Sequence, residues 1–171
     1  MSIVKDMSLA PSGQRKIDWV RSFMPALSQI EARFAREKPF SGLRAAVSVH
    51  LEAKTANLAL VLQEGGAKVY LTGCNPLSTQ DDVAAAVAQR GVETFGLHGV
   101  TPEQYEDLLC ETLKCHPHIV IDDGGDLVGL LTGRCKEYAD CVIGGCEETT
   151  TGILRLRARE QAGTMPFPMM A

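Results

Sequence analysis

The stretch Ile119-Val120-Ile121-Asp122-Asp123-Gly124-Gly125-Asp126 decides how the fold of this chain is interpreted. Its apolar start predicts a buried strand. The three carboxylates and two glycines that follow do not favour any regular element, because like charges repel and glycine weakens strands and helices. Glycines do let a ligand approach the backbone, and clustered carboxylates can have pKa values suited to proton transfer. The stretch therefore predicts a functional site at the end of a buried strand.

Strand and helix patterns alternate on both sides of this stretch. Apolar spacing predicts a helix over 14–36, with Ser12 as its N-cap and a kink or break at Pro25. Strands are predicted over 45–49, 68–72, 92–97, 118–121 and 139–143, and helices over 55–64, 79–90, 102–114 and 147–160. Such alternation predicts an α/β fold: a doubly wound, Rossmann-like or flavodoxin-like, mostly parallel sheet with helices on both faces.

Helix start signals support two of these elements. Ser78 or Thr79 is predicted to cap a helix that carries Asp81 and Asp82 in its first turn, where the helix dipole favours anions. Thr101-Pro102-Glu103-Gln104 reads as a capping box with proline at the first helical position.

Composition narrows the class of protein. The chain has 171 residues, 45% of them hydrophobic and 22% charged, with a net charge of -4 and no block of Lys or Arg. These values argue against nucleic acid or an anionic membrane as a partner. No run reaches the roughly 20 apolar residues of a membrane span, and residues 1–14 lack a signal-peptide pattern. We expect a cytoplasmic protein whose six cysteines are reduced and, without a C-x-x-C pair, bind no metal.

Polar clusters follow nearly every predicted strand. His50 and Glu52 follow the first, Asn75 with Ser78-Thr79-Gln80 the second, His98 the third, residues 122–126 the fourth, and residues 147–151 the fifth. Ligands of open parallel sheets bind outside the carboxyl ends of the strands. A capping or loop role explains any one cluster equally well, but together they favour a polar cleft along that edge.

Four of these segments resemble one enzyme family. They resemble segments of the S-adenosyl-L-homocysteine hydrolases (adenosylhomocysteinases), in the same order and spacing. The four segments are Val49-His50-Leu51-Glu52-Ala53-Lys54-Thr55-Ala56, residues 74–82, residues 121–126 and Glu147-Glu148-Thr149-Thr150-Thr151-Gly152. The resemblance covers nearly all of the chain from Ile17. It implies a cytosolic enzyme of the methyl cycle that reversibly splits S-adenosylhomocysteine into adenosine and homocysteine. In the family a bound NAD oxidises the ribose 3'-hydroxyl, which acidifies the 4'-hydrogen and permits elimination of the thiol.

The resemblance also implies roles for individual residues. His50 matches the histidine near the leaving sulfur and the 5' carbon, Asp123 the aspartate beside it, and Glu148 the glutamate that binds the ribose hydroxyls. Thr149, Thr150 and Thr151 match residues that approach the cofactor. The predicted substrate-binding residues are Glu52, Lys54, Thr55, Asn75, Ser78, Thr79 and Gln80.

One departure from the family concerns length. Family members continue to a catalytic lysine and an NAD-binding domain, and no G-x-G-x-x-G follows a strand here. We therefore expect a helical segment over 1–40, a substrate-binding domain over 41–171, a missing NAD-binding domain and an inactive isolated chain. The resemblance implies a homotetramer for the full-length enzyme. A non-catalytic nucleoside-binding module and a flavodoxin-like interaction domain remain as alternatives.

A second departure concerns the nucleobase. Many family members have threonine and glutamate where this chain has Glu52 and Lys54. A lysine donates and an ionised glutamate accepts, which fits the O6 and N1–H of hypoxanthine better than the edge of adenine. An unpaired buried polar group costs about 1–3 kcal/mol, so the exchange could change preference tenfold or more. The sequence thus favours S-inosylhomocysteine as an accepted substrate. The alternative is that Glu52 and Lys54 pair with each other and that the backbone reads adenine.

Overall fold

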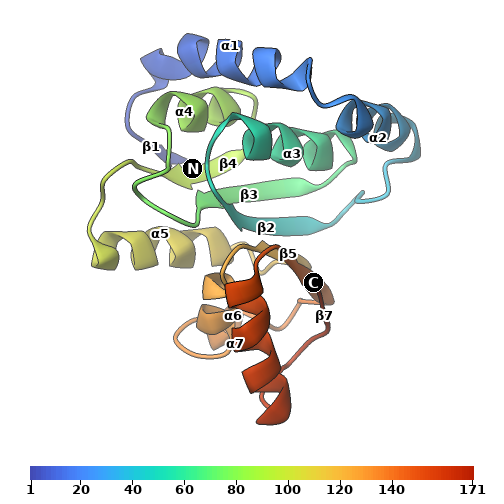
Figure 1. The fold of residues 1–171 in the computed structure, drawn as a ribbon, viewed down its shortest axis with the longest axis vertical. Coiled ribbons are helices and arrows are strands. Elements are labelled where there is room, and N and C mark those ends of the chain that lie inside the picture. Colours follow the sequence, from blue (N-terminus) through green and yellow to red (C-terminus); the bar gives the residue numbers. More distant parts are fainter.

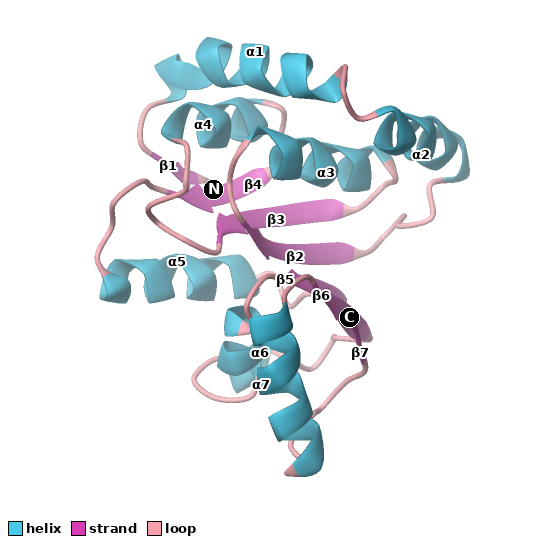
Figure 2. Ribbon diagram, in the orientation of Figure 1, coloured by secondary structure: helices cyan, strands magenta, loops and turns pink.

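The computed structural model describes residues 1–171 and confirms the α/β, doubly wound fold. One all-parallel sheet has the strand order β1-β4-β3-β2-β5-β6-β7 (Figures 1 and 2). The strands are β1 (Ile3–Val4), β2 (Arg44–Val49), β3 (Lys68–Gly73), β4 (Glu93–Gly96), β5 (Ile119–Asp122), β6 (Gly144–Glu147) and β7 (Met169–Met170). The α-helices are α1 (Ala10–Arg21), α2 (Pro25–Glu37), α3 (Ala53–Glu64), α4 (Asp81–Gln89), α5 (Pro102–Leu113), α6 (Asp126–Leu131) and α7 (Thr150–Gln161). Two 3-10 turns, η1 (Met7–Leu9) and η2 (Lys136–Tyr138), complete the chain.

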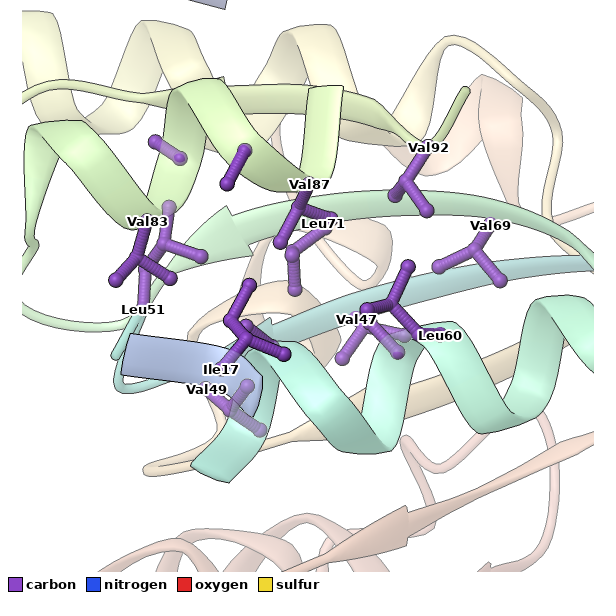
Figure 3. Packing of buried hydrophobic residues seen from close by; sticks show 14 of the residues in the cluster. Ile17, Val47, Val49, Leu51, Leu60, Val69, Leu71, Val83, Val87 and Val92 are labelled. Atoms are coloured by element: carbon purple, nitrogen blue, oxygen red, sulfur yellow. The ribbon is translucent and has the colours of Figure 1, made fainter. Parts of the chain in front are cut away.

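Two hydrophobic cores cover the two faces of the sheet. Ala45, Val47 and Val49 of β2 point into a cluster with the helices α1, α3 and α4, whereas Ala46 points into a second cluster with α5, α6 and α7. This alternation is the period of two that a strand imposes. Figure 3 shows the first cluster, in which side chains of α1, α3 and α4 meet those of β2 and β3. No helix combines the length and the apolar character that crossing a membrane requires.

The N-terminal helices are built around a close contact between α1 and α4. Pro25 splits the predicted helix into α1 and α2, as expected, but the prediction of Ser12 as N-cap is wrong. The helix already begins at Ala10, and the Ser12 hydroxyl donates instead to Asp82 Oδ2 at 2.9 Å. A Cβ on Gly13 would lie 2.0 Å from the carbonyl oxygen of Asp82, so only glycine fits between the two helices.

Three further helices begin at residues other than those predicted. α3 begins at Ala53 with Glu52 as its N-cap, and α4 begins after Gln80 rather than after Ser78 or Thr79. α7 begins at Thr150 rather than at Glu147, because Glu147 is still paired in β6. The hydroxyls of Ser78 and Thr79 both donate to the carbonyl oxygen of Asn75, which closes a turn before the helix and leaves neither free to cap it. The capping box that starts α5 at Thr101 is confirmed.

The predicted fifth strand is wrong in position. Residues 139–143 form turns, and β6 lies at Gly144–Glu147. Glycine is required there, because a Cβ on Gly145 would lie 2.6 Å from the Val120 oxygen of β5 and 2.7 Å from the Met169 sulfur of β7. The prediction rested on the apolar residues before the glycines, but Ile143, the last of them, is exposed and belongs to no strand. The short helix α6 and the edge strands β1 and β7 were not predicted.

The strand order places a switch point between β2 and β5. Chain connections from β2 run to β3 and β4 on one side, and the connection from β4 crosses back to β5 on the other side. Crossovers leave on opposite faces at such a point, so a crevice forms outside the carboxyl ends of the two strands. His50 directly follows β2 and Asp123 directly follows β5. The fold therefore brings these two predicted site residues together.

Candidate active site

Three side chains meet where three neighbouring strands end. His50, Cys74 and Asp123 each occupy the first position after β2, β3 and β5, which lie side by side in the order β3-β2-β5. His50 Nε2 lies 3.8 Å from Asp123 Oδ2, and the Cys74 thiol donates to the same oxygen at 3.1 Å. Sequence reasoning missed Cys74 as a member of the site. Its position directly after a parallel strand was the signal that could have identified it.

A second contact fixes the orientation of the His50 ring. His50 Nδ1 lies 2.6 Å from the Ser78 hydroxyl oxygen, and that hydroxyl donates to the carbonyl oxygen of Asn75 at 3.1 Å. Because the Ser78 proton is committed to Asn75, Ser78 accepts from Nδ1–H of His50. In the neutral ring this leaves a lone pair on Nε2, directed at the Asp123 carboxylate. Two acceptors facing each other favour a proton or another cation between them.

The loop after β3 supports His50 more than it lines the site. Asn75 Oδ1 accepts from the backbone N–H of Leu77 at 2.9 Å, which makes an Asx turn. Thr79 is buried, and Gln80 accepts from Lys16 of α1 at 2.9 Å. Of the predicted substrate-binding residues in this loop, Ser78 therefore contacts His50, whereas Thr79 and Gln80 point elsewhere.

The carboxylates of the loop after β5 have separate environments. Asp122 is fully buried and accepts from the backbone N–H groups of Asp123 at 3.1 Å and Val128 at 3.0 Å. Burial raises its pKa to about 7, against the lowering effect of the hydrogen bonds from α6. Asp126 accepts from the Tyr105 hydroxyl at 3.0 Å and forms a 2.7 Å ion pair with Arg155. Asp122 therefore accepts backbone hydrogen bonds, whereas the partners of Asp126 are side chains.

Glycines leave the space above this loop open. Gly124 and Gly125 have φ values of 103° and 81°, in the left-handed region that other residues rarely adopt. A Cβ on Gly124 would meet no atom within 4 Å, so the backbone there faces open space beside Asp123. A ligand-binding role of the glycines stays a prediction, and the open space lies at Gly124, since a Cβ on Gly125 would meet Arg155 at 3.6 Å.

Glu147 and Glu148 are neighbours with opposite surroundings. Glu147 is buried, and its Oε1 accepts from the N–H of Gly124 at 2.8 Å and from the N–H and hydroxyl of Thr149 at 2.8 and 2.7 Å. Glu148 is exposed, and only its backbone N–H is fixed, by a bond to the Asp122 carbonyl at 3.0 Å. Glu147 thus ties the loop after β5 to the start of α7, while the Glu148 carboxylate remains available.

The thiol of Cys74 is held in its protonated form. Burial raises its pKa most, followed by the hydrogen bond to Asp123 and that carboxylate's negative charge, with the charge of Glu148 adding to the effect. Glu148 directly follows β6, which pairs with β5, and its backbone N–H bonds to the Asp122 carbonyl, so it lies on the same edge as Asp123. The predicted catalytic residues His50, Asp123 and Glu148 are therefore assembled on one edge of the sheet.

The three threonines at the start of α7 differ in their availability. Thr149 is the N-cap: its hydroxyl oxygen accepts from the Gly152 N–H at 3.0 Å and donates to Glu147. Thr150 and Thr151 lie exposed in the first turn, and their hydroxyls have no hydrogen-bond partner in the structure. Only these two present free hydroxyls beside the site.

The residues at the start of α3 form a capping box. Glu52 Oε1 accepts from the backbone N–H of Lys54 at 3.0 Å and of Thr55 at 3.2 Å, while the Thr55 hydroxyl donates to the His50 carbonyl. Lys54 is exposed and forms no ion pair with Glu52 or with any other carboxylate. The ion pair that the alternative interpretation required is absent.

His98 and a groove beside α7 lie apart from this assembly. His98 follows β4, and its Nδ1 lies 3.0 Å from the Thr79 carbonyl, which ties it to the start of α4. A groove of about 690 Å³ lies between α7 and residues 165–171, and its lining includes Leu156 and Phe167 but none of the converging side chains.

Comparison with known proteins shows which family the chain resembles. A family model for S-adenosyl-L-homocysteine hydrolase matches residues 1–143. The chain is 51% identical over 170 residues to the S-inosyl-L-homocysteine hydrolase of Methanococcus maripaludis and 52% identical over 167 residues to that of Methanocaldococcus jannaschii. It is 50% identical over 168 residues to the adenosylhomocysteinase of Pyrococcus abyssi.

These matches cover 98–99% of the chain but only 40–41% of each relative, so the chain spans about two fifths of their length. The family model matches most of the chain, and the relatives are about half identical to it over nearly its full length. The chain therefore belongs to the S-adenosyl-L-homocysteine hydrolase family.

Proposed function

We propose that this chain supplies the substrate-binding part of an enzyme that reversibly hydrolyses the thioether of a nucleosyl-homocysteine to the nucleoside and L-homocysteine. The observation that carries the proposal is the meeting of His50 and Asp123 at the switch point of the sheet, with Glu148 on the same edge. Membership of the family supports this reaction class. Within the proposal, residues 41–171 form the substrate-binding domain, and residues 1–40 add the edge strand β1 and the helices α1 and α2 to it.

His50 is proposed to move a proton at the 5' position of the nucleoside. Its Nδ1–H is held by Ser78, so Nε2 is the nitrogen that takes up or releases the proton. Imidazole is the side chain best suited to take up and release a proton at neutral pH. Asp123, 3.8 Å away, stabilises the imidazolium once Nε2 has gained that proton.

Glu148 is proposed to bind the ribose hydroxyls. Its carboxylate is exposed and is not committed to any hydrogen bond within the chain. A carboxylate accepts hydrogen bonds from two neighbouring hydroxyls, which would hold the 3'-hydroxyl in a fixed position.

NAD is the cofactor that we infer from the family, and the free hydroxyls of Thr150 and Thr151 fit a contact with one end of it. When bound, NAD would supply the hydride acceptor for oxidation of the ribose. Thr149, already committed as the helix cap, would position the other two rather than bind the cofactor itself. We further propose a homotetrameric, cytoplasmic full-length enzyme on the basis of the family resemblance.

The nucleobase is proposed to be hypoxanthine. The Lys54 ammonium has no partner within the chain and can donate to the O6 of hypoxanthine. Glu52 uses Oε1 to cap α3, which leaves Oε2 as an acceptor for the N1–H of the base. Relatives named for inosyl and for adenosyl substrates are equally similar to this chain, so overall identity does not choose between the bases.

Calorimetric titration of S-inosylhomocysteine and S-adenosylhomocysteine into the chain tests this proposal. We expect at least tenfold tighter binding of the inosyl compound, and we expect Lys54→Ala to abolish the preference, with the exposed Lys136→Ala as a matched control. Equal affinities, or a preference for the adenosyl compound, would refute the hypoxanthine assignment. Failure of both compounds to bind would refute the substrate-binding role and favour an interaction domain. Hydrolysis is to be measured with NAD in the protein that contains this chain; binding without hydrolysis there would favour a nucleoside-binding module.

A further inference from the structure

We propose that His50, Cys74 and Asp123 form a binding site for a divalent cation of borderline softness, with zinc as the best fit. One ligand atom from each side chain, a nitrogen, a sulfur and an oxygen, lies within 4.8 Å of the other two. This inference goes beyond the proposed reaction, which uses His50 and Asp123 for proton transfer and gives Cys74 no chemical role.

The donor set selects the class of metal. Zinc is bound by imidazole nitrogen, thiolate sulfur and carboxylate oxygen, whereas magnesium and calcium prefer oxygen ligands alone. One histidine, one cysteine and one aspartate leave a fourth tetrahedral position for water or another small ligand. The site is open to solvent on the side of His50, whose side chain is 49% exposed, while that of Asp123 is only 10% exposed.

The present spacing is close to that of a tetrahedral site. Zinc bonds of ~2.0–2.3 Å place neighbouring ligand atoms roughly 3.3–3.7 Å apart. The Cys74–Asp123 and His50–Asp123 pairs lie at 3.1 and 3.8 Å, and the third pair, His50–Cys74, lies within 4.8 Å. Side-chain rotations that move the ligand atoms by up to about 1 Å therefore suffice. The backbone need not move, because all three residues directly follow paired strands of one sheet.

The surroundings hold the ligands in a binding orientation. Ser78 accepts from Nδ1–H of His50, which leaves the Nε2 lone pair pointing at Asp123. A hydrogen bond to the second ring nitrogen is the usual support of a metal-bound histidine. Asp123 is held through its backbone N–H, which donates to Asp122 at 3.1 Å. On binding, the Cys74 thiol releases its proton to solvent and its thiolate sulfur bonds to the cation.

One other group on the surface has similar chemistry and serves as a control. His116 and Asp140 form a 2.8 Å pair, and the free cysteine Cys141 directly follows Asp140 in the chain. His116 Nδ1 already contacts Asp140 there, and the group is formed by the α5–β5 and η2–β6 loops, which precede strands, rather than at the carboxyl ends of adjacent strands. Variants of Cys74 and Cys141 thus separate the proposed site from general affinity of surface cysteines for metal.

Titration of the reduced chain with Co²⁺ under anaerobic conditions tests the inference without any substrate. We expect one equivalent of Co²⁺ to produce a thiolate-to-cobalt charge-transfer band in the near ultraviolet, and one equivalent of Zn²⁺ to remove it. Cys74→Ser should abolish the band and weaken zinc binding at least tenfold, whereas Cys141→Ser should change neither. Absence of the band in the unmodified chain, or its persistence in Cys74→Ser, would overturn the inference.

Circular dichroism establishes that each variant is folded. If Cys74→Ser does not fold, His50→Gln, at an exposed position, tests the same site. Loss of the imidazole should also weaken Co²⁺ binding at least tenfold. Unchanged binding in a folded His50→Gln variant would equally overturn the site. Metal binding is measured without nucleoside. Failure to bind Co²⁺ would therefore not count against the proposed hydrolase function, which the titration with nucleosyl-homocysteines tests separately.

Discussion

Replacing Glu147 with alanine should destabilise the fold, whereas the same change at Glu148 should not. Glu147 Oε1 accepts three hydrogen bonds, from the N–H of Gly124 and from the N–H and hydroxyl of Thr149. Each bond to a charged group contributes about 1.5–3 kcal/mol. Against this stands the cost of burying the carboxylate, whose Oε2 has no partner. We expect a net loss of about 3 kcal/mol for Glu147→Ala, which for a domain of this size lowers the Tm by about 6–12 °C.

The matched variant Glu148→Ala removes an exposed carboxylate from the next residue. Its stability should change by less than ~0.5 kcal/mol, while binding of the nucleosyl-homocysteine should weaken at least tenfold. Thermal unfolding followed by circular dichroism measures the first effect, and calorimetric titration the second. Equal Tm values for the two variants, or a greater loss of stability for Glu148→Ala, would refute the assignment of Glu147 as the structural carboxylate of the pair.

Three further predictions concern the rest of the molecule. Gly13→Ala should lower the Tm despite the better helix propensity of alanine, because its Cβ would lie 2.0 Å from the Asp82 oxygen; Gly129→Ala, with no atom nearer than 3.6 Å, should not. Asp82→Asn should destabilise the chain near pH 7. Burial opposes a lower pKa for Asp82, but its hydrogen bonds to α1 keep that pKa below the usual value. The stability that Asp82 contributes is therefore present above pH ~4 and is lost as the pH falls through the folded pKa. Urea titrations should show the free energies of unfolding of the two proteins converging below pH ~4. Cys110 and Cys135, whose sulfurs lie 3.0 Å apart, should form a disulfide with each other when oxidised glutathione is added. Mass spectrometry should show the loss of two thiols, and Cys135→Ser should not show it. A mixed disulfide of Cys110 with glutathione as the only product would contradict this.

The fold could be predicted because its signals are local and repeated. Apolar runs of strand length alternate with helical stripes, and proline and glycine separate them, which suffices for a doubly wound sheet. The errors occurred where tertiary packing overrides local preference. Gly144 and Gly145 weaken a strand in isolation, but the approach of β5 and β7 makes glycine necessary at 145. Ser12 has the preference of an N-cap, but its partner is Asp82, 70 residues away.

The location of the site could be predicted from the sequence, but the contacts that each of its residues makes could not. The rule that ligands bind at the carboxyl ends of parallel strands places His50, Asp123 and Glu148 on one edge. It does not indicate that Gln80 turns to Lys16, or that Cys74 donates to Asp123, because these depend on side-chain directions after the strand has ended. Nor does residue type alone distinguish a glutamate that caps a helix, such as Glu52, from one that is free.

The pleat of the sheet explains why acidic residues at this edge occur in adjacent pairs. Asp122 and Glu147 are partners in the register of β5 and β6, and both are buried. Side chains alternate in direction along a strand, so the next residue in each case, Asp123 or Glu148, points away from the side that buries its neighbour. The buried member accepts backbone N–H groups from the residues that follow and fixes their path, which in turn fixes where the second member lies. Moving either pair by one residue would exchange the two roles, so the chemistry of this edge depends on strand register as much as on the identity of the carboxylates.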